Sequence, residues 1–195
     1  MIKIGILGDI GSGKSFVAKQ FTCPVFDADK EVSRIYQSDK SCYKKIKKKF
    51  PKFIKSKTIE KKELGNVIKA NKKNLKKLSN IVHPLVRKRM NIFFKKNSTK
   101  KMVVLDIPLL IENKLYDKNF YLIFIQSKSS EINKRLKKRP LYNKNIINNL
   151  RKSQKSLTYK KKISNYVIKN NFKPQSLKKI IKKIKKEILN ERSSS

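Results

Sequence analysis

The sequence predicts a three-layer α/β fold, in which helices cover both faces of a parallel sheet. Five short apolar segments are typical of buried strands, at residues 2–7, 23–26, 102–106, 120–125 and 167–168. Segments with the apolar spacing of amphipathic helices separate them. This alternation favours a parallel sheet with helices on both faces.

The elements follow in order along the chain. The first strand ends in a glycine turn at Gly8, and a helix should begin near Lys14 and run through Phe21. A helical pattern then extends from Lys30 to about Lys96. We expect further helices over about 130–138, 145–155 and 175–190, the last with its apolar residues on one face and lysines on the other.

The length of 195 residues is that of one domain with small insertions. The helical stretch between the second and third strands is too long for a simple crossover. We therefore expect one domain, 1–195, whose core is about 1–29 and 101–190. An inserted helical substrate-binding subdomain would occupy about 30–98, and a lid about 138–152.

Nothing in the sequence indicates a membrane or an oxidising compartment. The longest apolar run, 102–111, is interrupted by Asp106 and Pro108 and falls short of the ~18 residues of a membrane span. The N-terminus has no signal-peptide pattern. Cys23 and Cys42 form no metal-binding or disulfide framework. We expect a cytoplasmic protein with free thiols, no membrane partner, and a monomeric or weakly oligomeric state.

The charge is extreme, because 52 Lys and Arg against 13 acids give a net charge of +39. Such a balance would normally suggest a nucleic-acid partner. However, only seven of the 52 are arginines, which bidentate recognition of phosphates favours. The lysines also accompany abundant Asn and Ile, residues with A/T-rich codons. We therefore favour codon drift and expect no specific nucleic-acid partner, while a functional polyanion-binding surface stays open as the alternative.

The strongest motif is Gly8-Asp9-Ile10-Gly11-Ser12-Gly13-Lys14-Ser15, which matches G-x-x-x-x-G-K-[ST] between a strand and a helix. Its glycines let successive backbone N–H groups converge on phosphate oxygens, and the helix start adds a positive dipole end. Lys14 would bridge the β- and γ-phosphates, and Ser15 would supply an oxygen to Mg²⁺. The motif predicts a P-loop NTPase fold that uses ATP and Mg²⁺.

Further motifs follow the loop in a fixed order. They are Asp27-Ala28-Asp29, His83-Pro84 preceded by leucines, Pro108-Leu109-Leu110-Ile111-Glu112, Arg135 with Arg139, Gln154, and a late strand ending at Asn170. On these motifs the chain resembles the dephospho-CoA kinase family along nearly its whole length. The loop alone occurs in very many NTPases, whereas this ordered set is much more specific.

The resemblance implies that ATP phosphorylates the ribose 3′-hydroxyl of dephospho-CoA, the last step of coenzyme A synthesis. The implied catalytic residues are Asp29, which orients or deprotonates the hydroxyl, Asp27 as second candidate, Lys14 and Arg139. The implied nucleotide-binding residues are Gly11, Ser12, Gly13, Lys14, Ser15, Phe16, Arg135 and Arg139, with Ser15 on the metal. The implied substrate-binding residues are Lys61, His83, Pro108, Leu109, Leu110 and Glu112.

Simpler roles stay open for several of these residues. Both aspartates could cap the helix near Lys30, and the arginines could be solvated helix charges. Asp106 could hold Mg²⁺ through water. For His83, a structural or substrate-contacting role is favoured over a proton shuttle.

The chain departs from the family pattern at several positions. The main departures are Asp9 for glycine, Phe16 for threonine, Lys61 for arginine, Ile132 for glutamine and Asn165 for aspartate. Asp9 would repel a triphosphate unless its carboxylate points outward. Two other functions remain possible: a kinase for a nucleotide or shikimate-like acceptor, and a basic nucleic-acid-binding protein with a vestigial loop. The intact Gly13-Lys14-Ser15 argues against the second.

Overall fold

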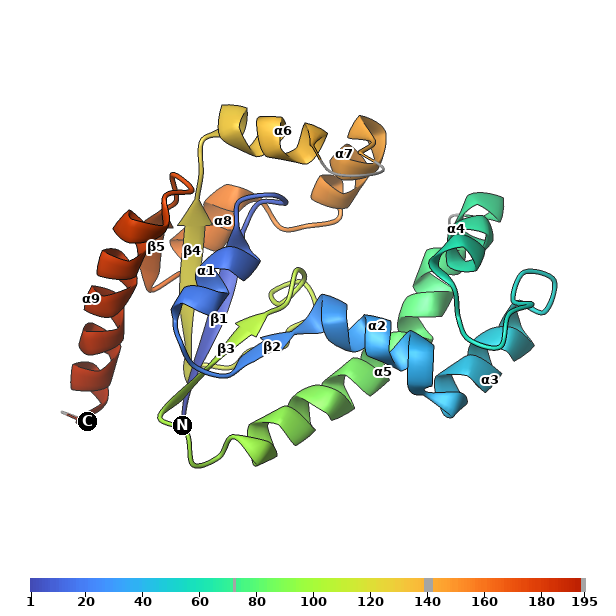
Figure 1. Ribbon diagram of the computed structural model, residues 1–195, viewed down its shortest axis with the longest axis horizontal. Coiled ribbons are helices and arrows are strands. Elements are labelled where there is room, and N and C mark those ends of the chain that lie inside the picture. Colours follow the sequence, from blue (N-terminus) through green and yellow to red (C-terminus); the bar gives the residue numbers. More distant parts are fainter. Residues whose placement is uncertain (72, 139–141, 194–195) are drawn as a thin grey trace. The chain divides into compact units, whose positions relative to one another are not determined.

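The computed structural model describes residues 1–71, 73–138 and 142–193 (Figure 1). It divides into two compact units, one comprising Met1–Asp27 with Thr99–Ser195 and the other Ala28–Ser98. The first unit holds the sheet, and the second is entirely helical. No helix within the described ranges is long and apolar enough to cross a bilayer.

The sheet has five parallel strands in the order β2-β3-β1-β4-β5, and it confirms the predicted α/β fold class. The strands are β1 (Ile2–Gly8), β2 (Val25–Asp27), β3 (Met102–Asp106), β4 (Phe120–Gln126) and β5 (Tyr166–Lys169). All five residues of β3 are buried, as are six of the seven in β1. These strands have nearly continuous apolar sequences because helices cover a parallel sheet on both faces, which buries the side chains of both.

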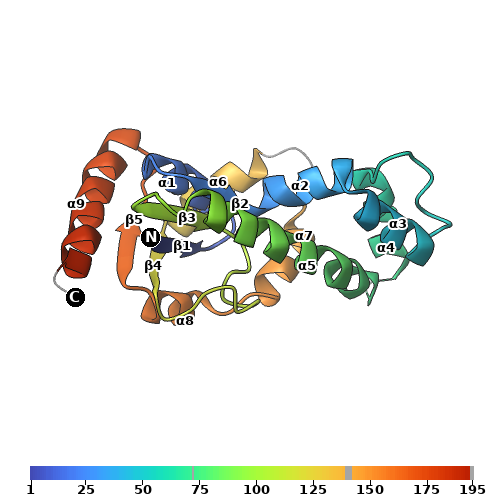
Figure 2. The same cartoon turned by 90° about the horizontal axis from the view of Figure 1, so that it is seen from below.

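The described part of the first unit contains the helices α1 (Lys14–Gln20), α6 (Ser129–Lys137), α7 (Lys144–Lys152), α8 (Leu157–Lys162) and α9 (Pro174–Ser193). Of these, α1, α8 and α9 pack on strands of the sheet. Helices α1 and α9 pack together, while α8 packs on β1 from the other side (Figure 2). The predicted apolar face of α9 is buried at Leu177, Ile181, Ile184 and Ile188.

Two expectations about this unit need correction. Helix α7 ends at Lys152 rather than near residue 155, and the separate short helix α8 was not predicted. Ser156 caps α8, because its hydroxyl accepts a hydrogen bond from the Tyr159 N–H. Apolar spacing could not reveal this helix, because α8 is lysine-rich and its only buried residue is Lys160.

The helical unit contains α2 (Ala28–Ser38), α3 (Lys40–Lys49), α4 (Lys61–Ala70) and α5 (Lys73–Lys96), and α5 contacts the other three. Its interior is apolar, with Ile35, Cys42, Ile46 and Val67 all fully buried. Glu63 ties down the loop before α4, because its carboxylate accepts hydrogen bonds from the backbone N–H groups of Lys55 and Ser56 at 2.8 and 2.9 Å.

Candidate active site

The turn after β1 has a backbone that requires glycine. Gly8 and Gly13 have φ values of 149° and 91°, a region that side chains rarely adopt. A Cβ on Gly8 would lie 2.8 Å from the Ile125 carbonyl oxygen, and one on Gly13 would clash with the Asn170 amide. At these two positions the loop backbone therefore lies closer to neighbouring protein atoms than a residue with a side chain would allow.

Lys14, the first residue of α1, reaches back across this loop. Its Nζ donates hydrogen bonds to the carbonyl oxygens of Gly8, at 3.2 Å, and Asp9, at 2.8 Å. The ammonium group is therefore held at the loop, where the sequence predicted it. Ser15, the next residue, is exposed, and Phe16 packs against the core of the sheet.

Ser12 anchors the loop to the carboxyl ends of two strands. Its carbonyl oxygen accepts hydrogen bonds from Ser127 Oγ, at 3.0 Å, and Asn170 Nδ2, at 2.8 Å. The C=O and the next N–H of a trans peptide point in opposite directions. The Gly13 N–H is therefore directed away from these protein contacts, as an anion-binding backbone group should be.

The carboxylate of Asp9 is bound by Arg151 of α7. Arg151 Nε and Nη2 donate to Asp9 Oδ1 and Oδ2 at 3.0 and 2.7 Å, and Oδ1 also accepts from the Ile10 N–H at 2.7 Å. The negative charge that raised doubt about this loop therefore has a cation in contact with it. Sequence reasoning missed Arg151, and no motif could have identified it among so many basic residues.

Helix α6 also lies against the loop. Its buried residues Ile132 and Leu136 would lie 3.0–3.2 Å from a Cβ on Gly11, so Ile132 serves as packing here. Arg135 on the same helix stacks over the Phe172 ring, with its guanidinium carbon 4.2 Å from the ring centroid. The Phe172 ring in turn lies beside Gly13. Arg135 is thus near the loop, whereas Arg139 lies outside the described residues.

Two aspartates end neighbouring strands. Asp27 and Asp106 are the last residues of β2 and β3, and they are register partners in the sheet. Asp106 is buried and Asp27 half-buried. Adjacent carboxylates of this kind suit a hard cation such as Mg²⁺. Asp29 is exposed in the first turn of α2, which belongs to the helical unit.

The segment from Pro108 to Glu112 divides into core and surface positions. Leu110 is fully buried and would clash with a Cβ on Gly5, while Pro108 and Leu109 are half-buried. Oε1 of Glu112 accepts from the backbone N–H of Lys155, at 2.8 Å, and from Lys160 Nζ, at 3.0 Å.

Lys160 is buried and completes a small polar network. Its Nζ also donates to Gln154 Oε1 at 2.8 Å. The network joins the segment after β3 to the chain between α7 and α8. Glu112 and Gln154, both identified from the resemblance, therefore contact protein groups here.

The two predicted substrate residues of the helical unit differ in exposure. Lys61 begins α4 and is exposed, while His83 is half-buried on α5. Burial, and to a lesser degree the charge of Arg87, lowers the pKa of the His83 imidazole. His83 is therefore neutral at neutral pH, which suits contact with a substrate or a structural role.

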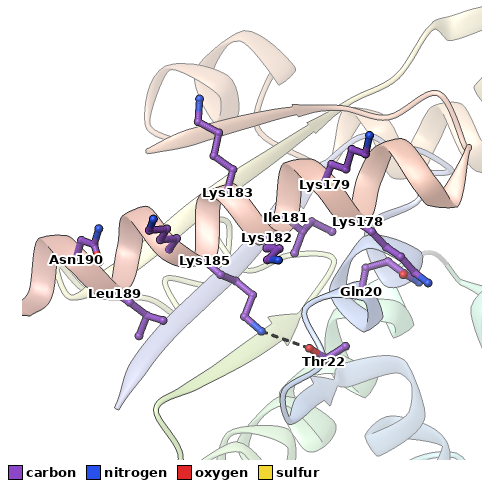
Figure 3. Close-up of a pocket in the computed structure, with 11 residues that line it drawn as sticks. Gln20, Thr22, Lys178, Lys179, Ile181, Lys182, Lys183, Lys185, Leu189 and Asn190 are labelled. Atoms are coloured by element: carbon purple, nitrogen blue, oxygen red, sulfur yellow. Dashed lines mark hydrogen bonds between the residues drawn. The ribbon is translucent and has the colours of Figure 1, made fainter.

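Hollows open at more than one place on the sheet unit. One of about 800 Å³ lies along α9, and lysines line it together with Gln20 and Thr22 (Figure 3). Lys185 crosses to donate to the Phe21 carbonyl, at 2.7 Å, and to Thr22 Oγ1, at 3.3 Å. Among the described residues, none of the predicted site residues lines this hollow. A smaller one of about 360 Å³ includes Asp9, Ser127 and Ile132 and borders the loop.

Comparison with known proteins gives a consistent result. The profile of the dephospho-CoA kinase family matches residues 2–176. The dephospho-CoA kinase of Wolbachia pipientis is 34% identical over 85% of this chain and 87% of its own length. That of Ehrlichia canis is 30% identical over 97% of this chain and 96% of its own.

Solved structures show the same fold. A Thermus thermophilus protein superposes with a TM-score of 0.76 at 26% identity, covering 95% of this chain and 97% of its own. Dephospho-CoA kinase from Campylobacter jejuni gives a TM-score of 0.66 at 23% identity, over 95% and 96% of the two chains. Shikimate kinase from Acinetobacter baumannii, at 16% identity, still reaches 0.52 over 98% of this chain and 94% of its own. The last two similarities concern the fold alone.

Proposed function

The chain belongs to the dephospho-CoA kinase family, and we propose how its residues carry out that family's reaction. ATP phosphorylates the ribose 3′-hydroxyl of dephospho-CoA, which yields coenzyme A and ADP. The observation that carries this conclusion is the glycine loop with Lys14 held across it, in a chain that matches the family from residue 2 to residue 176. The resemblance read from the sequence is thereby confirmed.

The phosphates of ATP bind the loop through the backbone N–H groups of residues 11–15. Lys14 exchanges its contacts with the loop carbonyls for the β- and γ-phosphate oxygens as negative charge accumulates on them. Arg135, beside the loop, approaches from the lid side, and Arg139 is proposed to act with it. Phe16 supports the loop from the core.

Oxygen donors near the loop fit Mg²⁺. The exposed Ser15 hydroxyl and the carboxylates at the ends of β2 and β3 form the donor set that this hard cation prefers. Ser15 would hold the ion directly, and Asp106 through water. When bound, Mg²⁺ neutralises phosphate charge.

Asp29 orients the acceptor hydroxyl and accepts its proton, with Asp27 as the second candidate. Transfer through a loose transition state depends more on positioning than on a strong base, so an exposed carboxylate is adequate. The substrate is proposed to contact the helical unit at 30–98 through Lys61 and His83.

The remaining acceptor contacts come from the segment after β3. Pro108 and Leu109 are half-buried there and present apolar surface, while Leu110 and Glu112 hold the segment in place. The lid at about 138–152 excludes water, which would otherwise compete as acceptor. We place this reaction in the cytoplasm, with the enzyme as a monomer or weak oligomer.

One assay tests the acceptor. Purified protein is given ATP, Mg²⁺ and, in separate reactions, dephospho-CoA, AMP, thymidylate or shikimate, and ADP release is followed with coupling enzymes. We expect turnover only with dephospho-CoA, and mass spectrometry of the product should show one added phosphoryl group. Preferred turnover of a nucleotide or of shikimate would overturn the proposal in favour of another kinase of the same fold.

A further inference from the structure

A carboxylate is an unfavourable group in a loop that binds a polyanion. Asp9 lies in the phosphate-binding loop, one residue after the glycine that ends β1. Two like charges about 6 Å apart repel strongly enough, near a protein surface, to change binding about tenfold or more. A nucleoside triphosphate would therefore bind poorly to this loop if the charge of Asp9 stood alone.

Moving the Asp9 carboxylate away from the phosphates would relieve this repulsion, but the movement would break a hydrogen bond. Its Oδ1 accepts a hydrogen bond from the Ile10 N–H at 2.7 Å, which holds the side chain against its own loop. Its backbone carbonyl oxygen is engaged by Lys14 Nζ at 2.8 Å. Only 14% of the Asp9 side chain is exposed, so bulk water screens it incompletely.

Arg151 supplies the opposite charge with a geometry that a lysine could not reproduce. Its Nε and Nη2 contact both carboxylate oxygens, at 3.0 and 2.7 Å, in the paired arrangement that fits guanidinium to carboxylate. The two residues are 142 positions apart in sequence. Helix α7 thus places the Arg151 guanidinium group against the Asp9 carboxylate of the loop.

We propose that Arg151 is a charge-compensating residue, which allows a phosphate-binding loop with an acid at position 9 to accept a nucleoside triphosphate. The inference rests on the proposed function, because it concerns the nucleotide of the same site. Arg151 acts through Asp9 rather than on the reacting atoms, so it is a positioning residue. Its expected contribution is to nucleotide affinity more than to the rate of transfer.

A second role for the pair would give different behaviour. If the pair served mainly to dock α7 on the loop, removing either partner would be equally harmful, since either change breaks the same contact. If it compensates charge, only loss of the cation is harmful, because loss of the carboxylate removes the repulsion itself. Breaking a charge pair from one side leaves an uncompensated charge, whereas neutralising both sides does not.

The test is a double-mutant cycle on the full-length protein. Arg151→Gln, Asp9→Asn and the double variant are compared with the wild type by calorimetric binding of a non-hydrolysable ATP analogue and of ADP. Lys152→Gln, next to Arg151 on the same helix and exposed, is the matched control. Circular dichroism and thermal melting establish that each variant is folded.

We expect Arg151→Gln to weaken binding of the ATP analogue about tenfold, and binding of ADP less, because ADP carries less charge. Asp9→Asn should bind at least as tightly as the wild type, and the double variant, in which the pair again carries no net charge, should lie within about twofold of the wild type. Lys152→Gln should have little effect. The loss in Arg151→Gln should appear mainly in the KM for ATP and only weakly in kcat.

Two results would overturn the inference. One is a double variant that binds as poorly as Arg151→Gln, which would mean that Arg151 acts on the nucleotide or on lid docking directly. The other is an Arg151→Gln protein that binds like the wild type. Failure of the proposed function looks different, because the wild type would then release no ADP with dephospho-CoA, whatever the pattern of analogue binding among the variants.

Discussion

The phosphate-binding loop and the helical unit differ in the surroundings of the side chains to which we assign a role in the reaction. In the loop, Lys14 bonds to two carbonyls and Ser12 is fixed by Ser127 and Asn170. In the helical unit, Asp29 and Lys61 are exposed. A preorganised group contributes to catalysis without reorganisation at the moment of reaction. We therefore expect the loop to be organised before ATP binds, whereas Asp29 and Lys61, which are proposed to contact the acceptor, lie at exposed positions.

The largest effect is expected from Lys14→Ala on the preorganised side. Turnover should fall by about 10²–10³ or more, because one positioned charge that stabilises the transferring phosphoryl group is lost. Thermal melting should change little, since Lys14 is half-exposed in the loop. A folded variant that keeps most of its activity, measured by ADP release, would break the comparison and the kinase assignment with it.

The next effect is expected from Asp29→Asn at the start of the helical unit. The amide keeps the size of the side chain but cannot accept the proton, so kcat should fall far more than ATP affinity. Asp27→Asn is the control and should reduce kcat less. Steady-state kinetics with both substrates measure this difference, and the reverse order of the two variants would assign the role to Asp27.

A smaller effect is expected on nucleic-acid binding at the lysine-lined hollow along α9. The described lining of this hollow has cationic side chains, as the loop does, but no glycine-rich backbone that could bind phosphate. If the charge of +39 reflects codon drift, a fluorescent oligonucleotide should bind weakly, without sequence preference, and lose affinity steeply with salt. ATP turnover should fall less over the same titration, because the loop binds phosphate through backbone groups in a partly closed site.

Lys178→Gln with Lys182→Gln sharpens this test, because both lysines line the hollow and neither is a predicted site residue. The double variant should lower oligonucleotide binding severalfold and leave ADP release unchanged. Sequence-dependent binding that persists near 0.3 M salt, where the Debye length is roughly 6 Å, would instead support a second, nucleic-acid role.

The smallest effect is expected at His83. Burial lowers the pKa of this imidazole below its ordinary value of 6.5. The folded protein therefore binds fewer protons than the unfolded chain, and the contribution of His83 to stability is lost as pH falls below about 6.5. When the pH is lowered from 7.5 to 5.5, the melting temperature of His83→Gln should fall less than that of the wild type. Equal losses would show that His83 does not titrate differently on folding.

Much of the fold could be predicted from the sequence because its signals are local. Apolar runs located all five strands, although β2 begins two residues later than expected and β5 is longer. Apolar spacing located α6, α7 and α9 to within a few residues. The glycine-lysine motif placed the phosphate loop, since its backbone geometry is encoded within eight consecutive residues.

Asn165 shows how a departure from the family pattern can have a local explanation that only the structure reveals. Its side-chain oxygen accepts from the Leu122 N–H, and its own N–H donates to the Leu122 carbonyl, each at 2.8 Å. An asparagine oxygen makes this bond as well as an aspartate oxygen would. The substitution therefore keeps the junction between β4 and β5.

The sequence by itself determined the strand and helix pattern and the phosphate loop, which depend on neighbouring residues. Only the tertiary structure decided which distant groups meet: the side chains of Asp9 and Arg151, those of Glu112 and Lys160, and the Ser12 carbonyl with the Asn170 amide. In a chain with 52 basic residues, periodicity gives nearly every lysine and arginine the same solvent-facing appearance. The partners of Asp9 and Glu112 lie more than forty residues away in the chain, and local sequence carries no signal for such contacts.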